Sequence, residues 1–332
     1  MKVLKNKEIN KTKWLNLISK SHFSSPFKAS LFYNFFNSIG NFSADVIAIE
    51  EDGEYKALVV ITIQKEKGMK SYFSRRGIIY GGPLVLNSGQ PYLKHLLKEV
   101  KKAYRNKLIY LEARNYFDYT FFRNSFKESG FEYVPWLNFH LDTSSDISVV
   151  KKSMSSSRLR QVKKAIKNGA EWKEAKSVEE VSAFYDILQD LYKYKIKKPL
   201  FSKEFFLEFY KQEIGKYLLV YYKGEVIGGI MCPMMSKTAI YEFYVCGLDS
   251  EYKNQYPSVM ATWAAMEYAN LNDIPLFDFM GAGDPNESYG VREFKSRFGG
   301  EEVEHGRFIN ILNPFLYKVG IIGLKLMSLL KR

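Results

Sequence analysis

An internal repeat is the feature of this sequence that most constrains its fold. Pro91 begins a predicted amphipathic helix that leads into an apolar strand, and Pro257 begins a second pair of the same kind, at an offset of 257 − 91 = 166 residues. Residues 126–132 are echoed by residues 294–301, at an offset of 294 − 126 = 168 residues. Two unlike motifs repeated at nearly the same distance indicate duplication of a whole domain, because the period is too long for a solenoid.

The chain length agrees with such a duplication. Its 332 residues suit two domains of about 150 residues each. Periodicity and turn signals predict the same order in each domain, with two helices, a run of antiparallel strands, and then helix, strand, helix and strand. We therefore predict an α/β (α+β) chain with a first domain at 1–145 and a second at 146–311. The tail, 312–332, is expected to pack back on the first domain.

The charge and the scarce metal-binding residues limit the function. A net charge of +13 favours an anionic partner, such as nucleic acid, a phosphorylated molecule or an anionic membrane face, although an AT-rich genome also enriches lysine. Four scattered histidines predict no metal site. Cys232 and Cys246 are interpreted as reduced core thiols, with pairing across a hairpin as the alternative. No targeting segment is visible at the start, so we expect a cytoplasmic protein.

A basic segment, 151–169, is the first candidate site, because it contains seven basic residues and no acid. Its serines can cap a helix, and a helix N-terminus favours anions. Arg158 and Arg160 near that start suit a phosphate or diphosphate, and Lys163 follows them. A solvated basic face is the alternative.

The most specific motif is 289–301. It contains Gly290, Phe294-Lys295 and Phe298-Gly299, and it resembles the Gly-x-x-x-Phe-Lys-x-x-Phe-Gly signature of the Fem family of non-ribosomal peptidyl transferases. The predicted order of elements also resembles the fold of the N-acetyltransferase (GNAT) superfamily, in tandem. The resemblance covers nearly the whole chain, but residues 178–211 lack a heptad run, so no coiled-coil arm is expected.

The resemblance implies an aminoacyltransferase of cell-wall biogenesis. Fem enzymes use aminoacyl-tRNA to add amino acids to the peptide stem of a peptidoglycan precursor, so the implied partners are aminoacyl-tRNA and a nucleotide- or lipid-linked cell-wall precursor. It makes Lys295 the best catalytic candidate, as an ammonium that stabilises an oxyanion or binds the tRNA terminus. The alternative is a surface lysine on a short helix. Further candidates for substrate contact are Tyr244, Tyr289 and Arg292, and those for tRNA contact are Lys164, Lys167 and Arg297.

Two acids complete the candidate site. Glu242 and Asp278 are expected on neighbouring strands, where a carboxylate can orient or deprotonate an attacking amine. A structural acid that accepts hydrogen bonds from loop N–H groups is the alternative for Asp278. Gly281 and Gly283 are not followed by a helix with a third glycine, so a dinucleotide-binding fingerprint is rejected.

The acyl donor is not expected to be a coenzyme. Residues 247–257, where acetyltransferases bind the diphosphate of coenzyme A, hold one glycine and two acids, which makes a poor diphosphate site. We therefore predict that the protein uses no cofactor. We expect aminoacyl-tRNA as the acyl donor in preference to acetyl-CoA. An N-acyltransferase that uses an acyl-CoA or carrier thioester on a surface polysaccharide or other amine is the alternative. A second alternative is a non-catalytic module that binds RNA or a membrane. The tail has four basic residues and no acid in 313–332, so it could lie on an anionic membrane.

Overall fold

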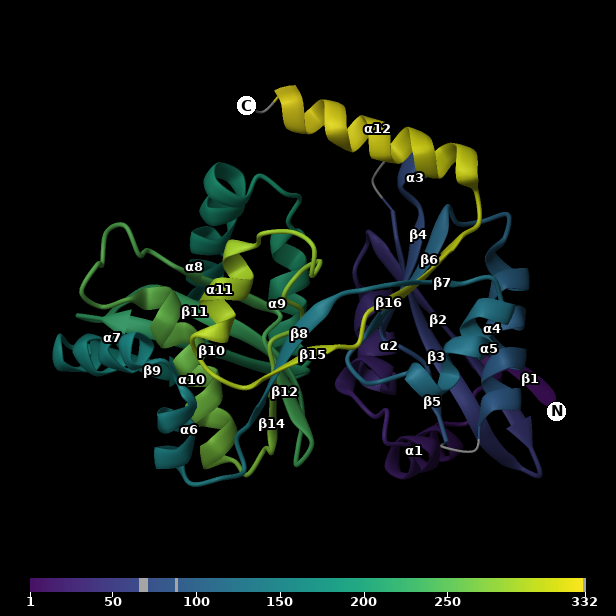
Figure 1. The fold of residues 1–332 in the computed structure, drawn as a ribbon, viewed down its shortest axis with the longest axis horizontal. Helices are drawn as coiled ribbons and strands as arrows, with labels where there is room; N and C mark the ends of the chain where they lie inside the picture. The colour runs from purple at the N-terminus through teal and green to yellow at the C-terminus, as the bar shows by residue number, and fades with distance from the viewer. Residues whose placement is uncertain (66–70, 87–88, 331–332) are drawn as a thin grey trace. The chain divides into compact units, whose positions relative to one another are not determined.

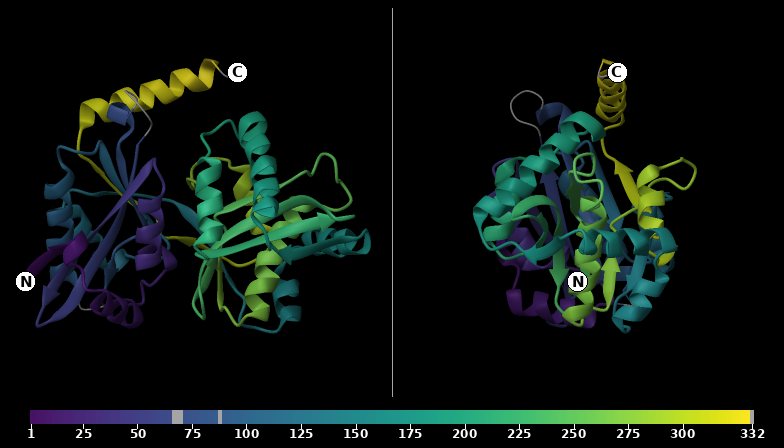
Figure 2. Two further views of the ribbon diagram at one scale, coloured as in Figure 1. Left: turned by 180° about the vertical axis from the view of Figure 1, so that it is seen from behind. Right: turned by 90° about the vertical axis from the view of Figure 1, so that its left-hand side faces the viewer.

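The computed structural model describes residues 1–65, 71–86 and 89–330 and divides into two compact units. The first unit is residues 1–135 with 304–332, and the second is 136–303 (Figure 1). Each unit is built on one mixed, eight-stranded sheet. The sheets and the helices that cover them are seen from two further sides in Figure 2.

The first unit has its strands in the order β1-β2-β3-β4-β6-β16-β7, with β5 beside β3. The strands are β1 (Lys2–Lys5), β2 (Phe42–Glu51), β3 (Glu54–Gln64), β4 (Arg76–Gly81), β5 (Leu84–Val85), β6 (Tyr110–Asn115), β7 (Glu132–Val134) and β16 (Arg307–Ile311). The helices are α1 (Lys11–Lys20), α2 (Ser30–Ser38), α3 (Ser71–Ser74), α4 (Gln90–Tyr104), α5 (Arg123–Glu128) and α12 (Pro314–Leu330), with short turns η1 (Asn6–Glu8), η2 (Pro26–Lys28) and η4 (Thr120–Phe122). The apolar side of α4 and strands β2, β3 and β6 share one buried core.

The second unit has the order β15-β8-β14-β12-β11-β10-β9, with β13 beside β11. The strands are β8 (Leu137–Asp142), β9 (Ala170–Glu174), β10 (Gly215–Tyr222), β11 (Glu225–Met235), β12 (Ala239–Tyr241), β13 (Tyr244–Gly247), β14 (Leu276–Asp278) and β15 (Glu301–Glu304). The helices are α6 (Ile147–Ser153), α7 (Ser156–Lys167), α8 (Val178–Asp190), the π-helix η5 (Leu191–Ile196), α9 (Lys203–Lys211), α10 (Pro257–Leu271) and α11 (Gly290–Ser296).

Helix α10 is the centre of the second core. Its residues are apolar on nearly every side, as expected for a helix that is buried rather than half-exposed. Trp263 and Met266 are fully buried in the same cluster as Phe277 of β14 and Phe298. Pro257 stands at the first helical position, where the missing N–H costs no hydrogen bond. Cys232 and Cys246 are both free and buried, as predicted.

The repeat predicted from the sequence is present in the topology. Pro91 lies in the first turn of α4 and Pro257 in that of α10, and each helix leads into a strand that pairs in parallel within its sheet, β6 with β4 and β14 with β12. Phe126 and Phe294 lie in the next α-helix of each repeat, α5 and α11. The two GNAT-like domains expected from the sequence are therefore confirmed as units of one fold.

The predicted domain boundaries are different from those of the structure, because two strands are exchanged. Strand β8 follows the first repeat but lies in the second sheet, between β14 and β15. Strand β16 follows the second repeat but lies in the first sheet, between β6 and β7. Boundaries at 1–145 and 146–311 therefore assign both strands to the wrong unit. Local patterning predicts that a segment is a strand, but it does not say which sheet the strand joins.

The tail begins on the first unit. The N–H groups of Leu312 and Asn313 both donate to the carbonyl oxygen of Ile109, each at 2.9 Å. The ring of Tyr317 lies 5.4 Å from that of Tyr110. Within the described part of the chain, α12 included, no helix has both the length and the apolar content needed to cross a membrane.

Candidate active site at the end of strand β14

The sheet of the second unit opens at the end of β14. Strands β12 and β14 pair in parallel up to Tyr241 and Asp278. Glu242 and Phe243 then interrupt the strand, and the N–H of Glu242 donates to the carbonyl of Asp278 at 2.9 Å while that of Phe243 donates to β11. Beyond this break, β13 continues beside β11, and in the described residues it pairs with no other strand. Strands β13 and β14 thus diverge at the place where Glu242 and Asp278 lie.

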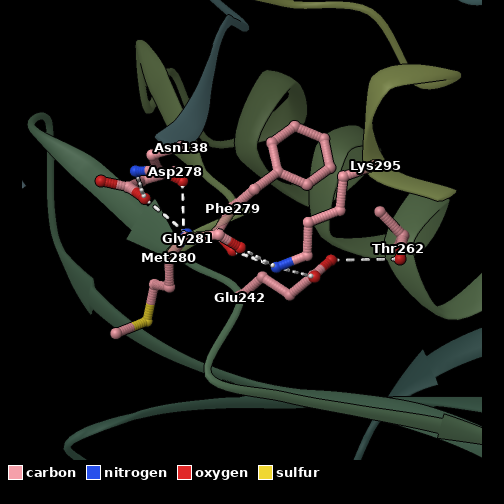
Figure 3. Close-up of polar contacts among 8 residues, drawn as sticks. All are labelled: Asn138, Glu242, Thr262, Asp278, Phe279, Met280, Gly281 and Lys295. Atoms are coloured by element: carbon pink, nitrogen blue, oxygen red, sulfur yellow. Dashed lines mark hydrogen bonds and ion pairs between the residues drawn. The ribbon is translucent and has the colours of Figure 1, made fainter. Parts of the chain in front are cut away.

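Lys295 lies under this opening with all of its donors used. Its side chain, from α11, is only 9% exposed. The Nζ atom is 3.1 Å from Oε1 of Glu242 and donates to the carbonyls of Gly281, at 3.0 Å, and Phe279 (Figure 3). An ammonium group has three N–H donors, and the three partners account for them. In this conformation Lys295 therefore has no donor left for an oxyanion, and it is not the surface lysine of the alternative either.

Glu242 is the charge partner of Lys295. Its side chain is buried, and Oε2 accepts a hydrogen bond from Oγ1 of Thr262 at 3.2 Å. Burial raises the pKa of Glu242 above its ordinary value, against the opposing effect of the Lys295 ammonium. Thr262 carried no signal in the sequence, because a threonine inside an apolar helix resembles any other core position.

Asp278 holds the loop that follows β14. It is 1% exposed, and its Oδ1 accepts hydrogen bonds from Nδ2 of Asn138, at 2.7 Å, and from the N–H of Met280, at 2.6 Å. Asn138 in turn accepts from the N–H of Gly281 at 2.7 Å. These contacts agree with the structural alternative for Asp278. Burial also leaves little room for the carboxylate to reach a substrate amine.

His140 joins the same group from β8. Its Nε2 is 3.2 Å from Oδ2 of Asp278. Burial lowers the pKa of His140, but Asp278 and Glu301 outweigh it, and the net shift is upward. His140 also lines a cavity of about 420 Å³ with Asp142, Ser145 and Glu301 among others. Neither Asn138 nor His140 was found from the sequence, because β8 was assigned to the other domain.

Arg292 and Lys295 together hold four carbonyls of the loop. Arg292 donates from Nε to the carbonyl of Ala282 at 2.9 Å, and its guanidinium also reaches the carbonyl of Asp284. The loop requires such support, because Met280 has a φ of 57° in the left-handed region, where a side chain is disfavoured. Arg292, predicted to bind substrate, thus faces the protein's own backbone.

Arg158, predicted to bind a phosphate, is buried against α11. It is 4% exposed, and its guanidinium stacks on the rings of Phe294 and Phe298 at 4.5 and 4.6 Å. It also donates to the carbonyl of Phe294 at 3.1 Å. Burial, followed by the nearby charge of Arg297, lowers the pKa of Arg158 to about 10. Ser155 caps α7, and Arg158 in the first turn of that helix contacts Phe294 of α11.

The other basic candidates are exposed. Among the side chains of α7, the basic ones of Arg160, Lys163, Lys164 and Lys167 are exposed, and Arg297 at the end of α11 is exposed as well. The Nζ of Lys164 lies 5.8 Å from the ring of Tyr256 at the start of α10. Five cations on adjoining elements of one unit form a surface that can bind phosphates.

Tyrosines gather beside the opening. Tyr289 caps α11, is 37% exposed, and packs against Gly283, where a Cβ would lie 2.7 Å from its ring. Burial, followed by the nearby Tyr289, raises the pKa of Tyr192 to about 12. Tyr192 also contacts the ring of Tyr244 at 6.0 Å. Tyr192 belongs to η5, and π-helical turns are frequent at functional sites.

The N-terminus of α10 is occupied by a carboxylate. Oδ1 of Asp249 accepts from the N–H of Ser258 at 3.1 Å, and Oδ2 accepts from the Ser258 hydroxyl. A negative charge at this point uses a backbone donor and the positive end of the helix dipole that a phosphate would otherwise use. Across the described ranges, no three His, Cys, Asp or Glu side chains are arranged to hold a metal ion.

The fold and this site define the class of the protein, a tandem N-acetyltransferase-like chain. Among solved structures it is similar to FemX (15% identity, TM-score 0.74, covering 96% of this chain and 99% of that one). It is also similar to L-PGS from Bacillus licheniformis (13%, 0.59, 96% and 97%). A tandem GNAT protein from the clavulanic acid biosynthesis pathway matches too (9%, 0.58, 94% and 99%). At these identities the matches establish the fold.

A family model gives a separate match to part of the chain. Residues 212–322 match the model of the FemAB family, and this range contains β14, its loop and the whole of the motif at 289–301. No curated protein matches the sequence. The resemblance to the Fem family is therefore confirmed over the matched range, and the whole chain is similar in fold to FemX.

Proposed function

We propose that the protein is an aminoacyltransferase that moves an amino acid from aminoacyl-tRNA to an amine of a peptidoglycan-precursor peptide stem. The FemAB match and the tandem GNAT-like fold support a transferase of this kind. The amine nitrogen attacks the ester carbonyl, a C–N bond forms, and the C–O bond to the ribose breaks. The amine gives up one proton, and the ribose oxygen leaves as a hydroxyl. Transfer from tRNA to a cell-wall precursor would take place in the cytoplasm.

The position of Asp249 at the start of α10 is the observation that favours aminoacyl-tRNA over a coenzyme A thioester as the donor. In a GNAT-like unit this helix start is the place where a coenzyme A diphosphate would meet backbone N–H groups. Here the carboxylate of Asp249 already accepts from Ser258, and its charge repels a diphosphate. A donor that has its phosphates elsewhere, such as a tRNA, avoids this conflict.

The exposed cations offer a place for those phosphates. Arg160, Lys163, Lys164 and Lys167 stand on one exposed side of α7, with no acid among residues 151–169. Phosphate contacts of this kind release counterions, so the affinity for tRNA should fall steeply with salt. Arg160 and Lys163 were predicted to bind the acceptor, and the exposed surface suits the donor's phosphates equally well.

The opening between β13 and β14 is the proposed place of reaction. An extended acyl chain or peptide can lie beside β13, whose only strand partner among the described residues is β11, and Tyr244 and Tyr289 offer half-exposed rings there. Under this opening, Lys295, Glu242 and Asp278 act as positioning residues. They fix the loop after β14, so that the reacting groups meet a rigid surface.

A direct comparison of donors tests the proposal. The full chain is titrated with aminoacyl-tRNA and, separately, with acetyl-CoA, and binding is followed by intrinsic fluorescence at low and high salt. We expect salt-sensitive binding of tRNA and no saturable binding of acetyl-CoA. Saturable binding of acetyl-CoA alone would instead support the N-acyltransferase alternative. Binding of tRNA without any transfer would support the non-catalytic module.

A further inference from the structure

Helix α12 turns an apolar face to solvent within the first unit. Phe315 is 74% exposed, Ile322 57% and Val319 39%. These three positions follow the spacing i, i+4 and i+7, so they lie on one side of the helix. Single exposed apolar residues are ordinary, but a continuous row of large ones marks an interaction surface.

Leu316 and Tyr317 attach the start of the helix to its own unit, and Ile321, on the side of Tyr317, is 39% exposed. Leu316 is buried, and its N–H is capped by the side chain of Asn313 at 3.0 Å. Tyr317 packs on Tyr110 of β6. The row of Phe315, Val319 and Ile322 is therefore not the surface by which α12 is attached to its own unit.

The charge of this segment is of one sign. Lys318 is exposed and stands beside Phe315 and Ile322 on the helix. Residues 313–332 hold four basic residues and no acid, and the whole chain has a net charge of +13. An anionic lipid surface attracts such a segment. A second copy of α12 would bring the same positive charge against Lys318, so self-association through this face is disfavoured.

We propose that α12 is an interfacial helix that binds the surface of an anionic lipid bilayer. Phe315, Val319 and Ile322 enter the boundary between head groups and acyl chains, and Lys318 remains at the level of the phosphates. The helix cannot cross the bilayer, so it lies in the plane of the membrane. This interaction does not depend on the proposed reaction, and it would bring the enzyme close to a lipid-linked acceptor.

Vesicle flotation with the full chain tests the proposal. We expect the protein to float with vesicles of phosphatidylglycerol and phosphatidylcholine, and to bind pure phosphatidylcholine much more weakly. Phe315→Ser combined with Ile322→Ser should lower partitioning at least tenfold, and Lys318→Glu should lower it about fivefold on anionic vesicles alone. Leu271→Ser is the matched control, because Leu271 is 69% exposed in the second unit, and it should bind like the wild type.

The same variants can overturn the idea. Equal binding to both kinds of vesicle would overturn the preference for an anionic surface, and unchanged flotation of the double serine variant would overturn the role of α12. A lower unfolding temperature of that variant, or a change from dimer to monomer by light scattering, would mean that protein covers the face. The lipid proposal requires the double serine variant to keep both the mass and the stability of the wild type.

Discussion

Replacement of Lys295 by methionine should destabilise the second unit strongly, because it leaves Glu242 buried without its charge partner. Removal of one member of a buried ion pair costs about 3–5 kcal/mol of unfolding free energy. The change also deprives the carbonyls of Phe279 and Gly281 of their donor. A domain is stable by only about 5–15 kcal/mol, so the variant should fold but with a much lower urea midpoint at pH 7.

The cost should depend on pH in a defined direction. Burial raises the pKa of Glu242, so the folded state favours the protonated acid. The stability that this group contributes is complete below its unfolded pKa of about 4.5 and is lost as pH rises toward the folded-state pKa. Without the opposing charge of Lys295 the loss becomes larger. The difference between variant and wild type should therefore be small near pH 4.5 and increase toward pH 7.

Two further variants identify the cause. In the Lys295→Met background, Glu242→Gln should recover at least about half of the lost stability, because it removes the uncompensated charge. Lys127 is the repeat counterpart of Lys295 but is exposed, so Lys127→Met should change stability by no more than about 0.5 kcal/mol. Tryptophan fluorescence suits the measurement, because Trp136, Trp172 and Trp263 all belong to the second unit. If Lys295→Met lies within about 1 kcal/mol of the wild type at pH 7, or shows no pH dependence, the ion pair does not have the role assigned to it.

Three other outcomes can be checked. Arg158→Ala should lower the unfolding free energy by about 2–4 kcal/mol, because it removes the stacking and a charged hydrogen bond. Arg160 is exposed, so Arg160→Ala should change the unfolding free energy by under about 0.5 kcal/mol. Equal effects of the two variants in urea denaturation would contradict the structure. The raised pKa of His140 means that its charge stabilises the fold fully below about pH 6.5 and that this stability is lost as pH rises through the folded-state pKa, so His140→Gln should remove that part of the pH–stability curve. Charge reversal of Lys163 and Lys164 to Glu should weaken tRNA binding and flatten its dependence on salt, and an unchanged slope in a filter-binding assay would exclude α7 as the contact surface.

Much of the fold could be predicted from the sequence. The repeat at offsets 166 and 168, together with Pro91 and Pro257 at the starts of equivalent helices, was enough for two similar α/β domains. The exchange of β8 and β16 could not be predicted. Pairing between strands far apart in the chain leaves no local pattern, and the sequence of 307–311 predicts a strand whichever sheet that strand joins.

The site was predicted in part, and for a physical reason. Lys295, Glu242 and Asp278 do lie together at the end of β14, as the motif and the strand order indicated. The roles of these residues could not be predicted as well. A sequence does not tell whether a lysine side chain donates to a substrate or to three hydrogen-bond acceptors of its own protein. Asn138, His140 and Thr262 were missed because each comes from an element that the motif does not include.

A single-turnover transfer assay tests the central claim most directly. The full chain is mixed with tRNA charged with labelled amino acids and with an extract of cell-wall precursors, and the label is followed from tRNA to a product that survives alkaline hydrolysis of the ester. The account predicts an amide product whose formation is abolished by prior RNase treatment and is not replaced by acetyl-CoA. Transfer that continues with an acyl-CoA after the tRNA is destroyed, or the absence of an amide product from every charged tRNA, would contradict it.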